Sequence, residues 1–167
     1  MYIIIVDDDN LQAEWLMAML KDFFQNSKIE WVDTEYEFRS RIDEFAEDPP
    51  DIIVMDVMLR WTYPSEDMPV LPDEVEKEGF YTAGFRCEEL LSGKEALKNV
   101  PLIFYTVLEK ADLKKRYEFV PGSTNLLTKQ GRAYLQKQKP RAYLRKSDEA
   151  NDLINLILKL TKSLAVR

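Results

Sequence analysis

Aspartates follow directly after two apolar runs in this chain. Asp7, Asp8 and Asp9 come after the apolar residues 3–6, and Asp56 comes after residues 52–55. If both runs are buried strands, they deliver several carboxylates to one place. Crowded carboxylates are costly unless a bound proton or a cation compensates their charge. The sequence therefore predicts a site for a hard divalent metal ion such as Mg²⁺.

The elements that must position these carboxylates alternate between strand-like and helix-like segments. We expect strands at residues 2–6, 29–32, 51–55, 102–105 and 142–145. Such alternation is typical of an α/β fold with a parallel sheet. The expected fold class is a doubly wound, five-stranded parallel sheet.

Three helices are indicated by caps and apolar spacing. Asp9 or Asn10 should cap the first, and Thr34 with Glu37 has the spacing of a capping box for a second that ends before residues 49–50. Ser147 should cap the last helix. The apolar positions expected along the first helix are Leu11, Trp15, Leu16, Ala18, Met19 and Phe23, and those along the last are Leu153, Leu156, Ile157, Leu160 and Leu164.

Two stretches interrupt this alternation. Residues 57–78 contain three prolines among many acids and are expected to form a long loop directly after Asp56. Such a loop is either a lid or partner-recognition element, or a tolerated surface insertion. A second, basic segment at about residues 119–141 separates the fourth and fifth strands.

Charge and composition narrow the function classes. The 167-residue chain carries a net charge of −7, has one cysteine and no histidine, and shows neither a signal peptide nor a membrane span. We expect a single cytoplasmic domain at residues 1–167 whose phosphoryl chemistry, if it uses histidine, needs a second protein. Residues 109–146 contain eleven Lys/Arg and three Asp/Glu, a net +8 that leaves −15 on the remainder. Residues 109–146 form either a solvated face or a docking surface for an acidic partner. If they form a docking surface, added salt should weaken docking.

A hydroxyl and an ammonium side chain also fall at predicted strand ends. Thr106 and Lys146 each follow a predicted strand, as the aspartates do. Ligands of open doubly wound sheets bind beyond the carboxyl ends of the strands. A metal held by acids, a nucleophilic carboxylate, a hydroxyl and an ammonium together suit phosphoryl transfer to an aspartate.

Four sequence blocks resemble the receiver domain of two-component response regulators. They are IIIVDDDN at 3–10, DIIVMDVML at 51–59, PLIFYT at 101–106 and AYLRKSDEANDLI at 142–154. The resemblance implies a flavodoxin-like (βα)5 fold with strand order 2-1-3-4-5. It covers nearly the whole chain, with the two interruptions lying between the blocks.

The resemblance also implies a role for each site residue. Asp56 would be the phosphoacceptor, and Thr106 and Lys146 would hold the phosphoryl group. The Mg²⁺ ligands would be Asp7, Asp8, Asp56 and the backbone carbonyl of Met58. Thr106 and Tyr143 would form the switch, in which Tyr143 fills space that Thr106 vacates.

The partners implied by the resemblance are other proteins. A sensor histidine kinase or a histidine phosphotransfer protein would supply the phosphoryl group, and a downstream protein target would recognise the phosphorylated surface. No DNA-binding domain is visible in the sequence. Receivers often pair through the face of helices four and five, so a homodimer is possible.

Several residues depart from the pattern of the family. Ser147 stands where proline usually follows the lysine, Arg60 stands where proline is common, and Val107 replaces a smaller residue. We expect Val107 to narrow access to Asp56 and to slow phosphate exchange. Lys129, which also ends a strand-like run, is the alternative to Lys146 as the conserved lysine.

Other interpretations stay open at the level of sequence. Asp7 and Asp8 could be caps, Thr106 an ordinary strand-end hydroxyl, and Tyr143 a core residue. The chain could be a receiver-like interaction module that is never phosphorylated. It could also be a phosphohydrolase of the haloacid dehalogenase type, because residues 7–9 resemble the opening motif of that family. That motif normally continues with Gly-Thr, which Asn10 and the residue after it do not match.

Overall fold

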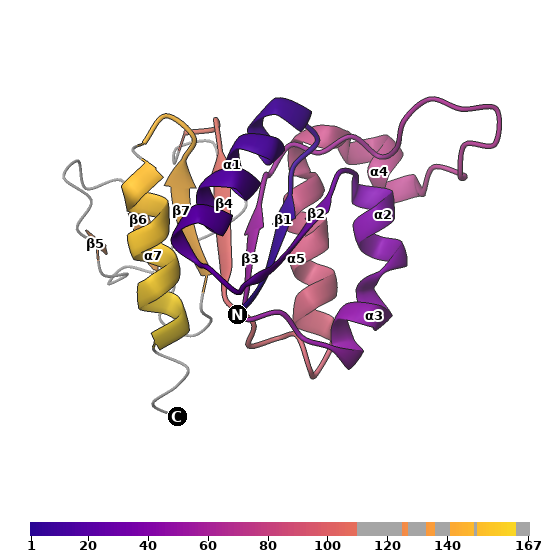
Figure 1. The fold of residues 1–167 in the computed structure, drawn as a ribbon. Helices are drawn as coiled ribbons and strands as arrows, with labels where there is room; N and C mark the ends of the chain where they lie inside the picture. The colour runs from indigo at the N-terminus through magenta and orange to yellow at the C-terminus, as the bar shows by residue number, and fades with distance from the viewer. Residues whose placement is uncertain (110–124, 127–132, 136–140, 149, 163–167) are drawn as a thin grey trace.

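The computed structural model describes residues 1–109, 125–126, 133–135, 141–148 and 150–162 (Figure 1). Lys129 and most of the positively charged stretch 109–146 lie outside these residues. Among the described residues, no helix is long and apolar enough to cross a membrane.

A parallel sheet forms the centre of the fold. Its strands are β1 (Tyr2–Val6), β2 (Lys28–Val32), β3 (Ile52–Met55), β4 (Leu102–Thr106) and β7 (Arg141–Arg145). They pair in the order β2-β1-β3-β4-β7, and every pair is parallel. The predicted fold class and the strand order 2-1-3-4-5 are confirmed. The residues of β1, β3 and β4 are buried throughout, because helices cover both faces of the sheet.

Two short strands extend the sheet beyond β7. They are β5 (Asn125–Leu126) and β6 (Ala133–Leu135), which pair antiparallel with one another, and β6 pairs antiparallel with β7. Neither was among the five strands expected, although β5 overlaps, at Leu126, the strand-like run that ends at Lys129. Part of the interruption expected before the fifth strand is therefore an addition to the sheet.

Helices pack on the two faces of the sheet in separate groups (Figure 1). One face carries α1 (Asn10–Phe23) and α7 (Ala150–Lys162), whose buried side chains join those of Ile3 and Ile5. The other face carries α2 (Glu35–Ser40), α3 (Ile42–Glu47) and α5 (Ala83–Gly93), which pack on Ile4 and Val6.

The buried face of α1 differs from the predicted stripe. Its buried residues are Ala13, Leu16 and Leu20, while Leu11, Trp15 and Phe23 are 80%, 47% and 51% exposed. Several apolar side chains surround this helix, so periodicity alone allowed more than one face. The predicted cap is present, because Asp9 accepts hydrogen bonds from the backbone N–H groups of Leu11 and Gln12.

The second predicted helix is divided in two. Thr34 Oγ1 accepts from the N–H of Glu37 as predicted, but α2 ends at Ser40 and α3 begins at Ile42. α3 ends at Glu47, before the prolines at 49–50. Phe38 of α2 and Phe45 of α3 both lie in the core, where their rings are 5.6 Å apart.

The last helix begins later than predicted. α7 starts at Ala150, so Ser147 is not its cap and instead belongs to a turn in which Asp148 accepts from the N–H of Arg145. Four residues of the predicted stripe, namely Leu153, Leu156, Ile157 and Leu160, are buried as predicted. Leu164 lies outside the described residues.

The long loop after β3 is shorter than predicted. Residues 57–72 contain no helix or strand, but α4 (Asp73–Glu78) and a 3₁₀ turn, η1 (Phe80–Thr82), follow. Pro72 is the residue before α4, where proline is tolerated, and Asp73 and Glu74 favour the first turn of a helix. Gly79, with a φ of 67°, ends α4.

Candidate functional site

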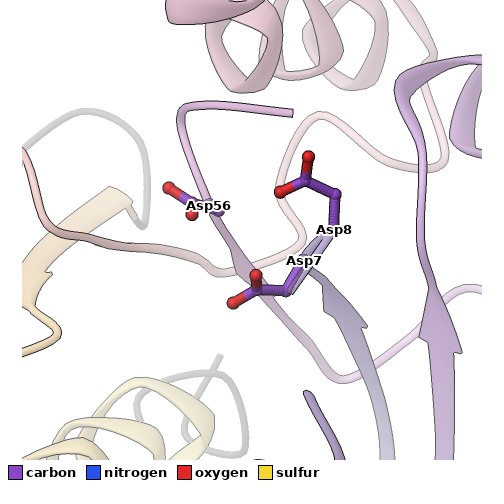
Figure 2. Close-up of side chains that lie close together, drawn as sticks. All are labelled: Asp7, Asp8 and Asp56. Carbon is purple, nitrogen blue, oxygen red and sulfur yellow. The ribbon is translucent and has the colours of Figure 1, made fainter. Parts of the chain in front are cut away.

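Three carboxylates meet at the carboxyl edge of the sheet. Asp7 and Asp8 follow β1, and Asp56 follows the neighbouring β3 (Figure 2). Val6 pairs with Met55, and the N–H of Asp56 donates to Val6 O at 2.8 Å, so the next residues of both strands stand side by side. One oxygen from each carboxylate lies within 4.8 Å of the others. The convergence predicted from strand ends is therefore present.

The Asp56 carboxylate is held by its own turn. Oδ1 accepts hydrogen bonds from the N–H groups of Val57 at 2.6 Å and Met58 at 3.2 Å. Oδ2 is left to face Lys146. The side chain is buried, so these bonds replace the water that an exposed carboxylate would have.

Lys146 bridges two of the carboxylates. Its Nζ lies 2.7 Å from Asp7 Oδ2 and 2.7 Å from Asp56 Oδ2. The pairing of β4 with β7 places this lysine, because its N–H donates to Thr106 O at 3.0 Å. Burial lowers the pKa of Lys146, but the two carboxylates outweigh burial and leave this pKa raised. The ammonium is therefore the charged counter-ion of the site.

The pKa of the Asp7 carboxyl is raised above its ordinary value. Burial raises its pKa from 3.8 to about 6, although Lys146 opposes the increase. The charge of Asp56 adds to the increase, and the N–H of Asp9, which donates to Asp7 Oδ1 at 3.1 Å, opposes it. A cation at this position would relieve the cost of keeping Asp7 ionised.

The two predicted switch residues converge on Leu108. Thr106 is completely buried, and its Oγ1 accepts from the N–H of Leu108 at 3.4 Å. Tyr143 is buried, and its hydroxyl donates to Leu108 O at 2.6 Å. The segment after β4 is thus held by both side chains. Val107, between them, is half-exposed, and its predicted effect on access to Asp56 remains a prediction.

Arg60 makes contacts that the sequence analysis missed. Its backbone N–H and Nε both donate to Asp8 Oδ2, at 3.1 and 3.0 Å, and a terminal nitrogen donates to Asp8 O at 3.2 Å. The departure from proline at this position gave a signal, because proline offers no N–H. The partner, 52 residues away, could not be read from the pattern.

Gly84 is a second residue that the sequence analysis missed. A Cβ at this position would lie 2.4 Å from Asp56 O, closer than any real Cβ contact. The N–H of Gly84 donates to Val57 O at 2.9 Å, which ties the start of α5 to the turn that follows Asp56. A glycine inside a helical segment is the only sequence signal for this close approach.

Asp9 and Ser147 take structural places. Asp9 caps α1, so its carboxylate is engaged with that helix. Ser147 follows Lys146 in a turn, and no peptide bond of the described residues is cis. Met58 stands on the turn that holds Asp56, and a metal-binding role for its carbonyl remains a prediction.

The donor set fits a hard divalent metal ion. Carboxylate oxygens are the ligands that Mg²⁺ takes, and it retains several waters beside them. A cavity of about 350 Å³, lined by Asp8, Asp9, Asn10, Arg60 and Tyr63, adjoins the cluster. This space admits a hydrated ion.

Comparisons with known proteins give a consistent fold. No protein-family profile and no curated protein matches the sequence. Solved structures do. The N-terminal domain of a response regulator/sensory box/GGDEF three-domain protein from Carboxydothermus hydrogenoformans is 17% identical, with 99% of this chain and 98% of that chain covered and a TM-score of 0.58.

Two further structures are similar to the same extent. The signal receiver domain of a DNA-binding response regulator from Colwellia psychrerythraea is 17% identical, covering 96% of this chain and 98% of that chain at a TM-score of 0.59. The signal receiver domain of a modulated diguanylate cyclase from Desulfovibrio desulfuricans is 19% identical, covering 99% and 96% at a TM-score of 0.58. The chain therefore has the fold of receiver domains.

Proposed function

We propose that this protein is a phosphoacceptor response regulator in two-component signalling, phosphorylated on Asp56. The observation that supports this most is the bridge from Lys146 to both Asp7 and Asp56, on a receiver fold. It unites a carboxylate nucleophile, an ammonium and a second acid at the edge where ligands of such sheets bind. Residues 1–167 would act as one receiver domain.

The reaction needs a donor outside this chain, which has no histidine. A carboxylate oxygen of Asp56 forms a bond to phosphorus while the bond from phosphorus to an imidazole nitrogen of the partner breaks. The imidazole keeps the bonding electron pair and takes up a proton. Lys146 stabilises the anionic oxygens that gather around phosphorus. The donor would be a sensor histidine kinase or a histidine phosphotransfer protein.

Asp7, Asp8, Asp56 and the Met58 carbonyl would hold the metal ion. A bound Mg²⁺ supplies positive charge to the transferring phosphoryl oxygens. Asp7 contributes a carboxylate whose buried charge favours a cation, as its raised pKa indicates.

The response would pass through Thr106 and Tyr143. Phosphorylation places new anionic oxygens beside Lys146, within the reach proposed for the Thr106 hydroxyl. If Thr106 turns toward them, the hydrogen bond that its Oγ1 accepts from the N–H of Leu108 is lost, while the Tyr143 hydroxyl still donates to the Leu108 carbonyl. The changed surface would be recognised in the cytoplasm by a downstream protein or a second copy of this chain.

Intact-mass measurement with acetyl phosphate and Mg²⁺ tests the proposal. Wild type should gain one phosphoryl group, and Asp56→Asn should not. Asp67→Asn, which changes an exposed acid of the long loop, is the matched control and should be phosphorylated as wild type is. An adduct that persists in Asp56→Asn would refute Asp56 as the acceptor.

The second candidate is a receiver-like interaction module that is not phosphorylated. The hydrogen bond from Arg60 Nε to Asp8 Oδ2 favours it, because this bond occupies a proposed metal ligand with a cation of the protein itself. This second candidate would be supported if the folded protein acquires no phosphoryl adduct and if beryllofluoride does not change the fluorescence of Trp61. The haloacid dehalogenase alternative is disfavoured because Asp9 caps α1.

A further inference from the structure

The charge of the acidic cluster is not balanced within the described residues. Three carboxylates face two cations, Lys146 and Arg60, which leaves one negative charge in excess. Adding a divalent cation to this set gives an excess of one positive charge. Removing one of the two side-chain cations at the same time gives neutrality, and a buried cluster favours neutrality because uncompensated charge is costly away from water.

Arg60 is held less firmly than Lys146. Lys146 is 10% exposed and bridges two buried carboxylates. Arg60 is 43% exposed and pairs with one carboxylate, that of Asp8, which is itself 24% exposed. Since solvent competes more strongly for an exposed pair, the Arg60 pair is the cheaper one to break.

The backbone at Arg60 stays in place when its side chain moves. Its carbonyl accepts from the N–H of Glu35 at 3.0 Å, and the carbonyl of Trp61 accepts from the N–H of Tyr36 at 2.9 Å. These bonds satisfy the first amides of α2, which have no partner inside the helix. The guanidinium also lies over the ring of Tyr63, with its carbon 4.6 Å from the ring centre. The side chain is therefore a movable group on a fixed support.

We propose that Arg60 is an internal counter-ion that competes with the divalent metal for Asp8. The proposal rests on the proposed function, since it assumes that the carboxylates bind Mg²⁺. In metal-free protein the guanidinium neutralises Asp8. Metal binding displaces it into the adjoining cavity lined by Asp9, Asn10 and Tyr63. Because such coupling is reciprocal, Arg60 weakens the affinity for Mg²⁺ as much as Mg²⁺ weakens the contact of Arg60 with Asp8.

Calorimetric titration with Mg²⁺ tests this competition. Arg60→Met keeps the apolar stem of the side chain and removes its charge, and it should bind Mg²⁺ about five to ten times more tightly than wild type. Arg39→Met is the matched control. Arg39 pairs with Glu74 at 2.8 Å and lies over the ring of Trp61. Its replacement therefore removes a cation from the same region without removing a contact to Asp8. Its affinity should stay within about twofold of wild type.

The Nε–H signal of Arg60 gives a second measurement on wild-type protein. This group donates to Asp8 Oδ2 at 3.0 Å, so in metal-free protein its proton should exchange slowly with water. Saturation with Mg²⁺ should speed this exchange, and the signal is identified by its loss in Arg60→Met. An exchange rate that Mg²⁺ leaves unchanged would overturn the competition.

The outcomes separate this inference from the proposed function. Equal Mg²⁺ affinity in wild type and Arg60→Met, with a normal phosphoryl adduct on Asp56, overturns the role of Arg60 and leaves the phosphoacceptor intact. Failure of both proteins to bind Mg²⁺ overturns both. Binding by Arg60→Met alone supports the competition in its strongest form.

Discussion

Replacing Asp7 with asparagine should stabilise the metal-free protein. A pKa of about 6, against 3.8 for an ordinary aspartate, means that the ionised side chain is about 3 kcal/mol less favourable in the folded chain than in the unfolded chain near pH 7.5. Asparagine avoids this cost but must itself be hydrogen-bonded, and Lys146 loses one partner. We therefore expect a net gain of about 1–2 kcal/mol in the free energy of unfolding.

The pH dependence follows from the direction of the shift. Because the pKa of Asp7 is raised on folding, folded wild type binds the proton more tightly, and stability falls as pH rises from 3.8 through about 6. The penalty is about 3 kcal/mol at pH 7.5 but only about 1.6 kcal/mol at pH 5. The advantage of Asp7→Asn should therefore shrink by about 1.4 kcal/mol between these two pH values.

Urea unfolding in the presence of a chelator, followed by tryptophan fluorescence, measures both quantities. Asp67→Asn removes an exposed carboxylate and should change stability by less than about 0.5 kcal/mol at either pH. Mg²⁺ should stabilise wild type and have little effect on Asp7→Asn. The reasoning is refuted if Asp7→Asn is no more stable than wild type at pH 7.5, or if its advantage is the same at pH 5.

Three further predictions concern the elements around the site. Gly84→Ala should destabilise the protein by about 2–4 kcal/mol in urea unfolding, because its Cβ would collide with the backbone carbonyl of Asp56, and unchanged stability would contradict this contact. Arg86→Met should cost about 3–5 kcal/mol, measured in the same way, since it leaves the buried Glu35 carboxylate without its main partner; a neutral result would refute that dependence. Tyr143→Phe should lose about 1 kcal/mol with the hydrogen bond to the Leu108 carbonyl, and thermal unfolding that does not change would show that water replaces it.

The core strands were predictable because their residues are buried on both faces. Continuous apolar runs ending in aspartate, threonine or lysine located β1, β3, β4 and β7 to within a residue or two. Strand ends then placed the carboxylates and Lys146 at one edge without any knowledge of contacts. Parallel topology supplied what local sequence could not, because it alone brings these ends together.

Features that depend on a distant partner were not predictable. Which face of α1 is buried depends on the side chains of the sheet against which the helix packs. Apolar spacing alone therefore could not show that Leu16 is buried while Leu11 and Trp15 are exposed. Pro72 immediately precedes α4 rather than excluding a helix there, because the effect of a proline depends on its position relative to the helix. The contact of Arg60 with Asp8 joins a loop to a strand end, and no periodicity records such a pair.

Two of the contacts that join the segment after Asp56 to the fold differ in their chemistry. At Asp8 it is held by a partly exposed charged pair, the one proposed above to compete with a metal ion, whereas at α2 its carbonyls accept from the N–H of Glu35 and of the next residue. The Glu35 carboxylate in turn holds Arg86 of α5 at 2.6 Å, and Arg86 also donates to Gly79 O at 3.0 Å, beyond α4. The edge of the sheet that carries Asp8 is thus connected through α2 to α5 and to the end of α4. Because the Arg60–Asp8 pair is more exposed than the Arg86–Glu35 pair, the proposed competition with a metal ion would alter the first pair and leave the second in place.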